Sequence, residues 1–228
     1  MNAELIKLVE NFKREVFNKN ELPNHKCFCV SYPLSLYLNM YKNYENELIC
    51  SFLNYPTLTT KLHYWIELNT GVIVDITIDQ FSNQLPIDEL PIVFNYNDSV
   101  NKPILSAAEY KKWFKIYHKP LDKSIDSIKS LYRNLSTYLQ DDSNNLKELL
   151  RVNLKAAIVL NNEIDRRGID INDKNRDDSE KYLEYFEFIN YIRQESFKWE
   201  ELSSILAEFR SNEDYQNLIL KIQSIQID

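Results

Sequence analysis

The sequence has only two glycines in 228 residues, at positions 71 and 168. Loops that bind dinucleotides or phosphates need several closely spaced glycines, so that the backbone can approach the phosphate groups. The Rossmann and P-loop classes are therefore excluded. Cysteine is also scarce: the three cysteines are an odd number, and no export signal precedes the first amphipathic segment. These features predict reduced thiols and a cytoplasmic protein.

Long apolar runs and excess positive charge are absent as well. No apolar stretch approaches the roughly 20 residues that a membrane-spanning helix needs. The chain carries 27 Lys and Arg against 34 Asp and Glu, a net charge of −7. Residues 121–228 hold 15 of these basic and 21 of these acidic residues, so they account for −6 of the total. This balance argues against a nucleic-acid partner and an anionic membrane partner. The acidic half has two interpretations, solvated helical faces or a surface for a basic protein partner.

The stretch HYWIELNTGVIVDIT, residues 63–77, predicts a β-hairpin, because two runs rich in β-branched and aromatic residues flank a short turn. A three-residue loop ending in a left-handed Gly71 fits the turn. This register places Asp75 opposite Trp65 and diagonal to His63, within reach of a side-chain hydrogen bond. The sequence thus predicts an apolar core face and a second face that carries a His–Asp pair.

A candidate nucleophile lies upstream, in HKCFCVSYPLSLYL, residues 25–38. Apolar residues at helical spacing predict a helix that starts at Cys27, with a kink at Pro33. The positive end of the helix dipole favours a thiolate at Cys27. Cys29 and Cys50 are interpreted as packing residues, because free cysteines are among the most buried residue types.

These motifs resemble known enzymes. Cys-Phe-Cys-Val-Ser is similar to the segment that opens the central helix of papain-like cysteine proteases. His63-Tyr-Trp-Ile-Glu67 followed by Asp75-Ile-Thr77 resembles the hairpin of transglutaminase-type domains, with Ile76 in place of the usual proline. The resemblance covers about residues 20–105 and extends to small prokaryotic and phage proteins of this superfamily. It implies an α+β core with an antiparallel sheet and an N-terminal cysteine helix.

The resemblance also implies the chemistry, which is thiol-dependent acyl transfer or hydrolysis of a protein or peptide substrate, without a cofactor. Cys27 would be the nucleophile, His63 the base, and Asp75 the group that orients the imidazole. Members include proteases, amidases, deamidases and toxins that act inside a target cell. The alternative is a non-catalytic binding module with a degenerate triad, which acts through its acidic helical half.

The sequence does not identify the second donor of the oxyanion hole. Papain-like enzymes carry a Gln about six residues before the Cys, and this sequence has Glu21 at that position. Three residues could supply the second donor instead: Asn24, His25 and Gln80. Trp65 has two interpretations, a lining of the substrate groove or an aromatic packed in the core.

Two sets of residues in the sequence have a spacing similar to that of metal ligands. The first set would form a zinc site, with the ligands His25, Cys27, Cys29, Cys50 and His63. Only one residue separates each of the first three ligands, which is closer than the usual spacing of zinc ligands. Asp173, Asn175, Asp177, Ser179 and Glu184 fall at EF-hand positions, but Asp178 stands where the loop needs glycine. We therefore predict no metal, and a polar loop before a helix at Ser179.

The chain is expected to divide near residue 120. Residues 1–120 mix helices with strands, and residues 121–228 read as helical throughout. Ser106 with Glu109 forms a capping-box pattern that predicts a helix over 107–118. His118 would support the last carbonyls of that helix. Gly168 is the expected C-cap of a long helix in the second half.

Overall fold

The computed structural model describes residues 3–17, 23, 25–59, 62–85, 93–94, 106–117, 126, 143–170, 173, 179–198, 207 and 209–225. The chain divides into two compact units, residues 1–121 and 122–228. Among the described residues, no helix is both long enough and apolar enough to cross a membrane.

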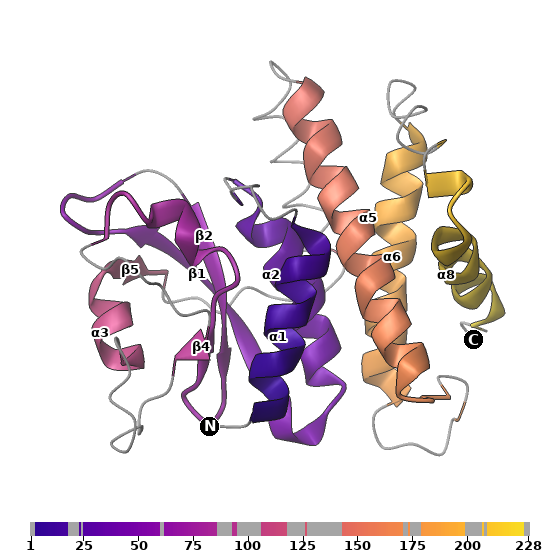
Figure 1. Ribbon diagram of the computed structural model, residues 1–228, viewed down its shortest axis with the longest axis horizontal. Coiled ribbons are helices and arrows are strands. Elements are labelled where there is room, and N and C mark those ends of the chain that lie inside the picture. Colours follow the sequence, from indigo (N-terminus) through magenta and orange to yellow (C-terminus); the bar gives the residue numbers. More distant parts are fainter. Residues whose placement is uncertain are drawn as a thin grey trace. The chain divides into compact units, whose positions relative to one another are not determined.

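The first unit is built around a five-stranded antiparallel sheet with the strand order β4-β3-β2-β1-β5. Its strands are β1 (Asn46–Leu53), β2 (Leu62–Leu68), β3 (Ile73–Val74), β4 (Val93–Phe94) and β5 (Phe114–Ile116). Helices and sheet in one unit make the protein α+β, as predicted (Figure 1).

The hairpin of β2 and β3 has the predicted register. Ile66 pairs with Val74, and the bond between Leu68 and Val72 leaves residues 69–71 as a three-residue loop. The Leu68 amide donates to the Val72 carbonyl at 2.8 Å, which closes the loop. Gly71 ends the loop with φ of 79°, a left-handed conformation that costs a residue with a Cβ more than glycine. The hydrophobic pattern and this glycine together determine the register.

Helices cover both faces of the sheet (Figure 1). On one face, α2 (Cys27–Asn39) packs against β1 and β2, and the Ser31 hydroxyl donates to the Tyr64 carbonyl at 3.2 Å. Residues 27–38 of α2 are all buried, and the helix continues through Pro33. α1 (Ala3–Val16) buries its apolar face in the same unit.

The opposite face of the hairpin is a second core. α3 (Ala107–Lys112) lies over this face, and the Tyr110 ring meets Trp65 edge-on at 5.1 Å. Trp65, Ile73 and Phe114 belong to one buried cluster there. The predicted second face, which carries the His–Asp pair, is therefore buried as well, because α3 and β5 fold back over the hairpin and cover that face with an aromatic layer.

α3 has the predicted capping box, in which the Ser106 hydroxyl accepts from the Glu109 amide at 3.2 Å. The helix ends at Lys112, however, six residues before the expected end. Phe114 instead starts β5 and pairs with Leu53 of β1. Pairing with β1 buries the Phe114 ring in the aromatic cluster, and this burial stabilises the strand. His118 lies outside the described residues.

The second unit contains α5 (Ser143–Arg166), α6 (Ser179–Lys198) and α8 (Glu213–Ser224), and α5 packs against both other helices. Gly168 caps α5 as predicted, with φ of 64°. The Ile169 amide donates to the Ile164 carbonyl at 3.3 Å, and the Gly168 amide to the Asp165 carbonyl at 2.9 Å. This pairing is the Schellman pattern, which satisfies carbonyls that the helix leaves open. Residues 124–139 belong to the half of the chain that reads as helical, and only residue 126 of this stretch is among the described residues.

Candidate active site

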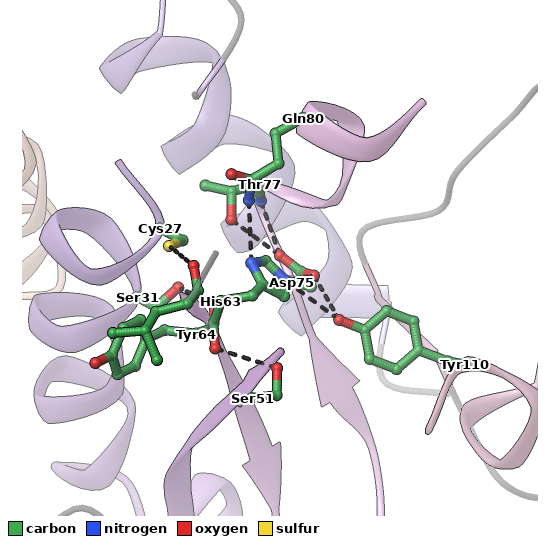
Figure 2. Close-up of polar contacts among 10 residues, drawn as sticks. Cys27, Ser31, Ser51, His63, Tyr64, Asp75, Thr77, Gln80 and Tyr110 are labelled. Carbon is green, nitrogen blue, oxygen red and sulfur yellow. Dashed lines mark hydrogen bonds and ion pairs between the residues drawn. The ribbon is translucent and has the colours of Figure 1, made fainter. Parts of the chain in front are cut away.

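His63 and Asp75 form a buried pair at the centre of the site. His63 Nε2 lies 2.6 Å from Asp75 Oδ2, and both residues are 0 % exposed (Figure 2). The hairpin creates this contact, because its register puts Asp75 diagonal to His63 on one face. The sequence predicted this pairing from the hydrophobic pattern and from the glycine that ends the loop.

Three further donors meet the Asp75 carboxylate. The Thr77 amide and hydroxyl donate to Oδ1 at 3.0 and 3.1 Å. The Tyr110 hydroxyl, from α3, donates to Oδ2 at 2.6 Å and lies 3.4 Å from His63 Nε2 (Figure 2). Each carboxylate oxygen thus accepts two hydrogen bonds, which stabilise a charge that burial would otherwise disfavour.

The remaining nitrogen of His63 faces Gln80. Gln80 belongs to a short 3₁₀ helix, η2 (Ile78–Phe81), and its Nε2 lies 3.0 Å from His63 Nδ1. An ionised carboxylate only accepts hydrogen bonds, so Nε2 carries the proton that goes to Asp75. Nδ1 is therefore the nitrogen that can exchange a proton with a substrate or a thiol. The Gln80 amide can donate to it when the ring is neutral, or turn and accept from it when the ring is charged.

Lys13 of α1 holds η2 in place. Its Nζ forms an ion pair of 2.9 Å with Asp79, the residue next to Gln80. The side chain of Gln80 is partly exposed, whereas His63 is fully buried. Gln80 is thus a polar group that connects the His63 ring with solvent.

Cys27 is the first residue of α2 and lies beside the pair. Its Sγ is 3.8 Å from the carbonyl oxygen of Leu62, the residue directly before His63 (Figure 2). The Cys27 thiol also acts, less than Asp75 does, to raise the pKa of His63. The structure therefore brings together all three residues of the predicted triad. The thiol is 4 % exposed.

The charges of the site depend on one another. Burial lowers the pKa of His63, but the charge and hydrogen bond of Asp75, with a smaller contribution from Cys27, outweigh this and raise the pKa to about 9. Burial acts to raise the pKa of Asp75, yet the His63 charge and the donors around the carboxylate lower it. The resting state favoured at neutral pH is an imidazolium next to a carboxylate.

Aromatic rings hold the imidazole from its sides. The Phe81 ring meets it nearly perpendicularly at 4.8 Å, and the Phe114 ring stacks on it at 5.2 Å with an interplanar angle of 27°. The Trp65 ring centre lies 5.8 Å away. Trp65 is fully buried in this layer, which agrees with its interpretation as an aromatic packed in the core. It positions the imidazole rather than a substrate.

The two other cysteines are free and buried, with Cys29 at 2 % and Cys50 at 9 % exposure. Cys50 pairs with Tyr64 across β1 and β2. Burial raises the pKa of Cys50, the hydrogen bond with Tyr64 opposes the rise, and the charge of Cys27 adds to it. Cys50 therefore lies within electrostatic reach of Cys27, which the sequence spacing did not indicate.

The segment before Cys27 contains a strained residue. His25 is exposed and has φ of 61°, and the Lys26 amide donates to the Pro23 carbonyl at 3.1 Å. Among the described residues, His25 alone has a left-handed φ without being glycine. The His25 side chain is thus exposed to solvent two residues before Cys27 in the sequence. Asn24 and Glu21 lie outside the described residues.

The metal patterns find no support in the described ranges, where no group of three or more His, Cys, Asp or Glu side chains could hold a metal ion. All five candidate zinc ligands are among the described residues, whereas Asn175 and Asp177 of the EF-hand pattern lie outside them.

Comparison with protein-family models, with curated proteins and with solved structures finds no match for the chain. A functional proposal therefore rests on the geometry around His63, Asp75 and Cys27.

Proposed function

We propose that the protein catalyses thiol-dependent acyl transfer or hydrolysis on an amide or ester of a protein or peptide. The observation that carries this proposal is the arrangement around His63, which has a carboxylate at Nε2, with the Cys27 thiol 3.8 Å from the carbonyl oxygen of the preceding residue, Leu62. A nucleophile, a base and a group that orients the base are the parts that covalent acyl transfer requires.

The steps follow from these positions. The Cys27 thiolate forms a bond to the carbonyl carbon, and the carbonyl electron pair moves to oxygen. As the tetrahedral intermediate collapses, the bond to the leaving group breaks, and His63 Nδ1 gives that group a proton. Water or an amine then attacks the thioester and loses a proton to Nδ1, and the Cys27 thiolate leaves. Asp75 holds the ring and compensates its positive charge throughout.

The oxyanion needs two donors in this scheme. The backbone amide of Cys27, at the start of α2, is one. Gln80 is our choice for the second, because its amide lies next to Nδ1 and is partly exposed. In the resting state that amide contacts the imidazole, and a bound carbonyl would replace the imidazole as its partner.

The architecture agrees with a papain-like or transglutaminase-like core in residues 1–120. A buried helix that starts at the candidate nucleophile packs on an antiparallel sheet, and that sheet carries the His and Asp in the order Cys, His, Asp. A reducing compartment such as the cytoplasm would keep the three buried thiols free.

The experiment compares two cysteines of equal burial. Cys27 and Cys29 are 4 % and 2 % exposed, so a difference in their reactivity reflects activation rather than access. Iodoacetamide at pH 6–8, followed by peptide mass spectrometry, should modify Cys27 much faster than Cys29. Acyl probes that form thioesters should label wild type and Cys29→Ala but not Cys27→Ala.

Equal modification of both cysteines, with no thioester on either, would contradict the proposal. The protein would then be a binding module whose site residues serve only the fold.

A further inference from the structure

We propose that Tyr110 is a positioning residue of this site, which fixes the acceptor oxygen of Asp75 and thereby the orientation of His63. The inference deepens the proposed function and rests on it for its catalytic meaning. Its structural content can be tested on the His–Asp pair alone. Nothing in the sequence pattern connected position 110 with residues 63 and 75.

The contact is short and fully enclosed. The Tyr110 hydroxyl donates to Asp75 Oδ2 at 2.6 Å, and Tyr110, Asp75 and His63 are all 0 % exposed. Burial and the neighbouring Asp75 charge raise the pKa of Tyr110 well above its usual value. The hydroxyl therefore keeps its proton at neutral and moderately alkaline pH, and it remains a donor there.

The two carboxylate oxygens are held from different parts of the chain. Thr77, two residues after Asp75, occupies Oδ1 through its amide and hydroxyl, whereas Tyr110 approaches Oδ2 from α3 (Figure 2). A carboxylate held at both oxygens cannot rotate freely. His63 Nε2 therefore meets one fixed acceptor, and Nδ1 stays directed toward Gln80.

Tyr110 is itself firmly held. The Ser106–Glu109 capping box fixes the start of α3, and an ion pair joins Lys111 of α3 to Glu67 of β2. The Tyr110 ring also packs against Phe114, with ring centres 4.9 Å apart. These anchors make the hydroxyl a rigid reference point rather than an adaptable one.

The test uses Tyr110→Phe with Tyr185→Phe as a matched control. Tyr185 is also fully buried, and its hydroxyl donates to the Ala157 carbonyl at 3.3 Å in the second unit. Each variant removes one buried hydroxyl donor, so the general cost to stability is comparable. The first readout is the ring resonances of His63 in ¹⁵N-histidine-labelled full-length protein, followed from about pH 2 to 10 so that the acid transition of Asp75, whose pKa is lowered, falls inside the range.

In Tyr110→Phe the carboxylate loses a donor that favours its charged form. We expect the acid transition, at which Asp75 protonates and the pair breaks, to move up by about one pH unit. Cys27 alkylation at pH 7 should slow by about tenfold, because the imidazole is less well oriented. Tyr185→Phe should change neither quantity.

An unchanged His63 titration in a folded Tyr110→Phe variant would overturn the inference, as would an equal shift in both variants. If Tyr110→Phe does not fold, Thr77→Val is the second test, because it removes one donor from Oδ1 and leaves the Oδ2 contact intact. It should raise the acid transition while slowing alkylation less than twofold; a tenfold slowing would contradict a special role for Oδ2. A shifted titration with an unreactive Cys27 in wild type would refute the proposed function but leave the positioning role standing.

Discussion

Replacing Asp75 by Asn tests the electrostatics of the site most directly. The two side chains have nearly the same shape, so the substitution removes the charge while keeping most of the packing. His63 would stay fully buried without a negative partner, and burial favours its neutral form. The pKa of His63 should therefore fall from about 9 to below the usual 6.5.

The size of this change follows from the same values. A fall from about 9 to below 6.5 exceeds two pH units, which corresponds to at least about 3 kcal/mol of lost preference for the charged ring. Loss of one partner of a buried ion pair costs stability of a similar order, about 3–5 kcal/mol. The imidazole should be neutral at pH 7 in the variant, and Cys27 should lose its charged neighbour.

The assay is a ¹H–¹⁵N titration of the histidine rings, which is simple here because the chain has three histidines. Asp165→Asn is the control, since Asp165 belongs to the second unit and pairs with Lys221 instead. It should leave the His63 titration unchanged. A His63 ring that still titrates near pH 9 in Asp75→Asn would refute the assignment of its charge to Asp75.

Other consequences can be measured separately. The raised pKa of His63 contributes its full stabilisation of the fold below pH 6.5, and this stabilisation disappears as the pH rises through about 9. The lowered pKa of Asp75 contributes stabilisation above the usual pKa of a carboxyl group, and this stabilisation is lost as the pH falls. Melting temperatures should therefore be highest between these limits, and a profile that rises steadily to pH 10 would be inconsistent with a charged pair. Gln80→Ala should slow acylation by carbonyl probes about a hundredfold while changing iodoacetamide alkylation much less, since only the carbonyl reaction develops an oxyanion; equal effects on both would exclude it as the donor. Gly168→Ala should lower the free energy of unfolding of the second unit by about 1 kcal/mol in urea denaturation, because a φ of 64° strains any residue with a Cβ. A Cβ added at this position would have no atom within 4 Å, so a clash would not explain the loss. Unchanged stability would contradict the role of backbone strain.

The parts of this site that the sequence predicted are those set by local rules. Alternation of apolar residues and one glycine were enough to derive the register that joins His63 to Asp75. The capping box was likewise visible within four residues. Helix periodicity placed Cys27 at the start of α2.

The parts that were missed depend on contacts between distant segments. The end of α3 could not be read locally, because pairing of Phe114 with Leu53, 61 positions earlier, decides that the chain turns into β5. Tyr110 reaches Asp75 across 35 positions, and no periodic pattern encodes such a contact. The same packing of α3 buried Trp65, which the hairpin alone would have left open on one side.

Burial of the hairpin on both faces also affects how often water reaches the site. The Nε2 proton of His63 lies inside the aromatic layer and is held by a carboxylate at 2.6 Å. Its exchange with solvent requires the layer to open, so it should give a slowly exchanging proton resonance. The rate at which this proton exchanges with solvent measures how often the aromatic layer around the imidazole opens, and the measurement needs no substrate.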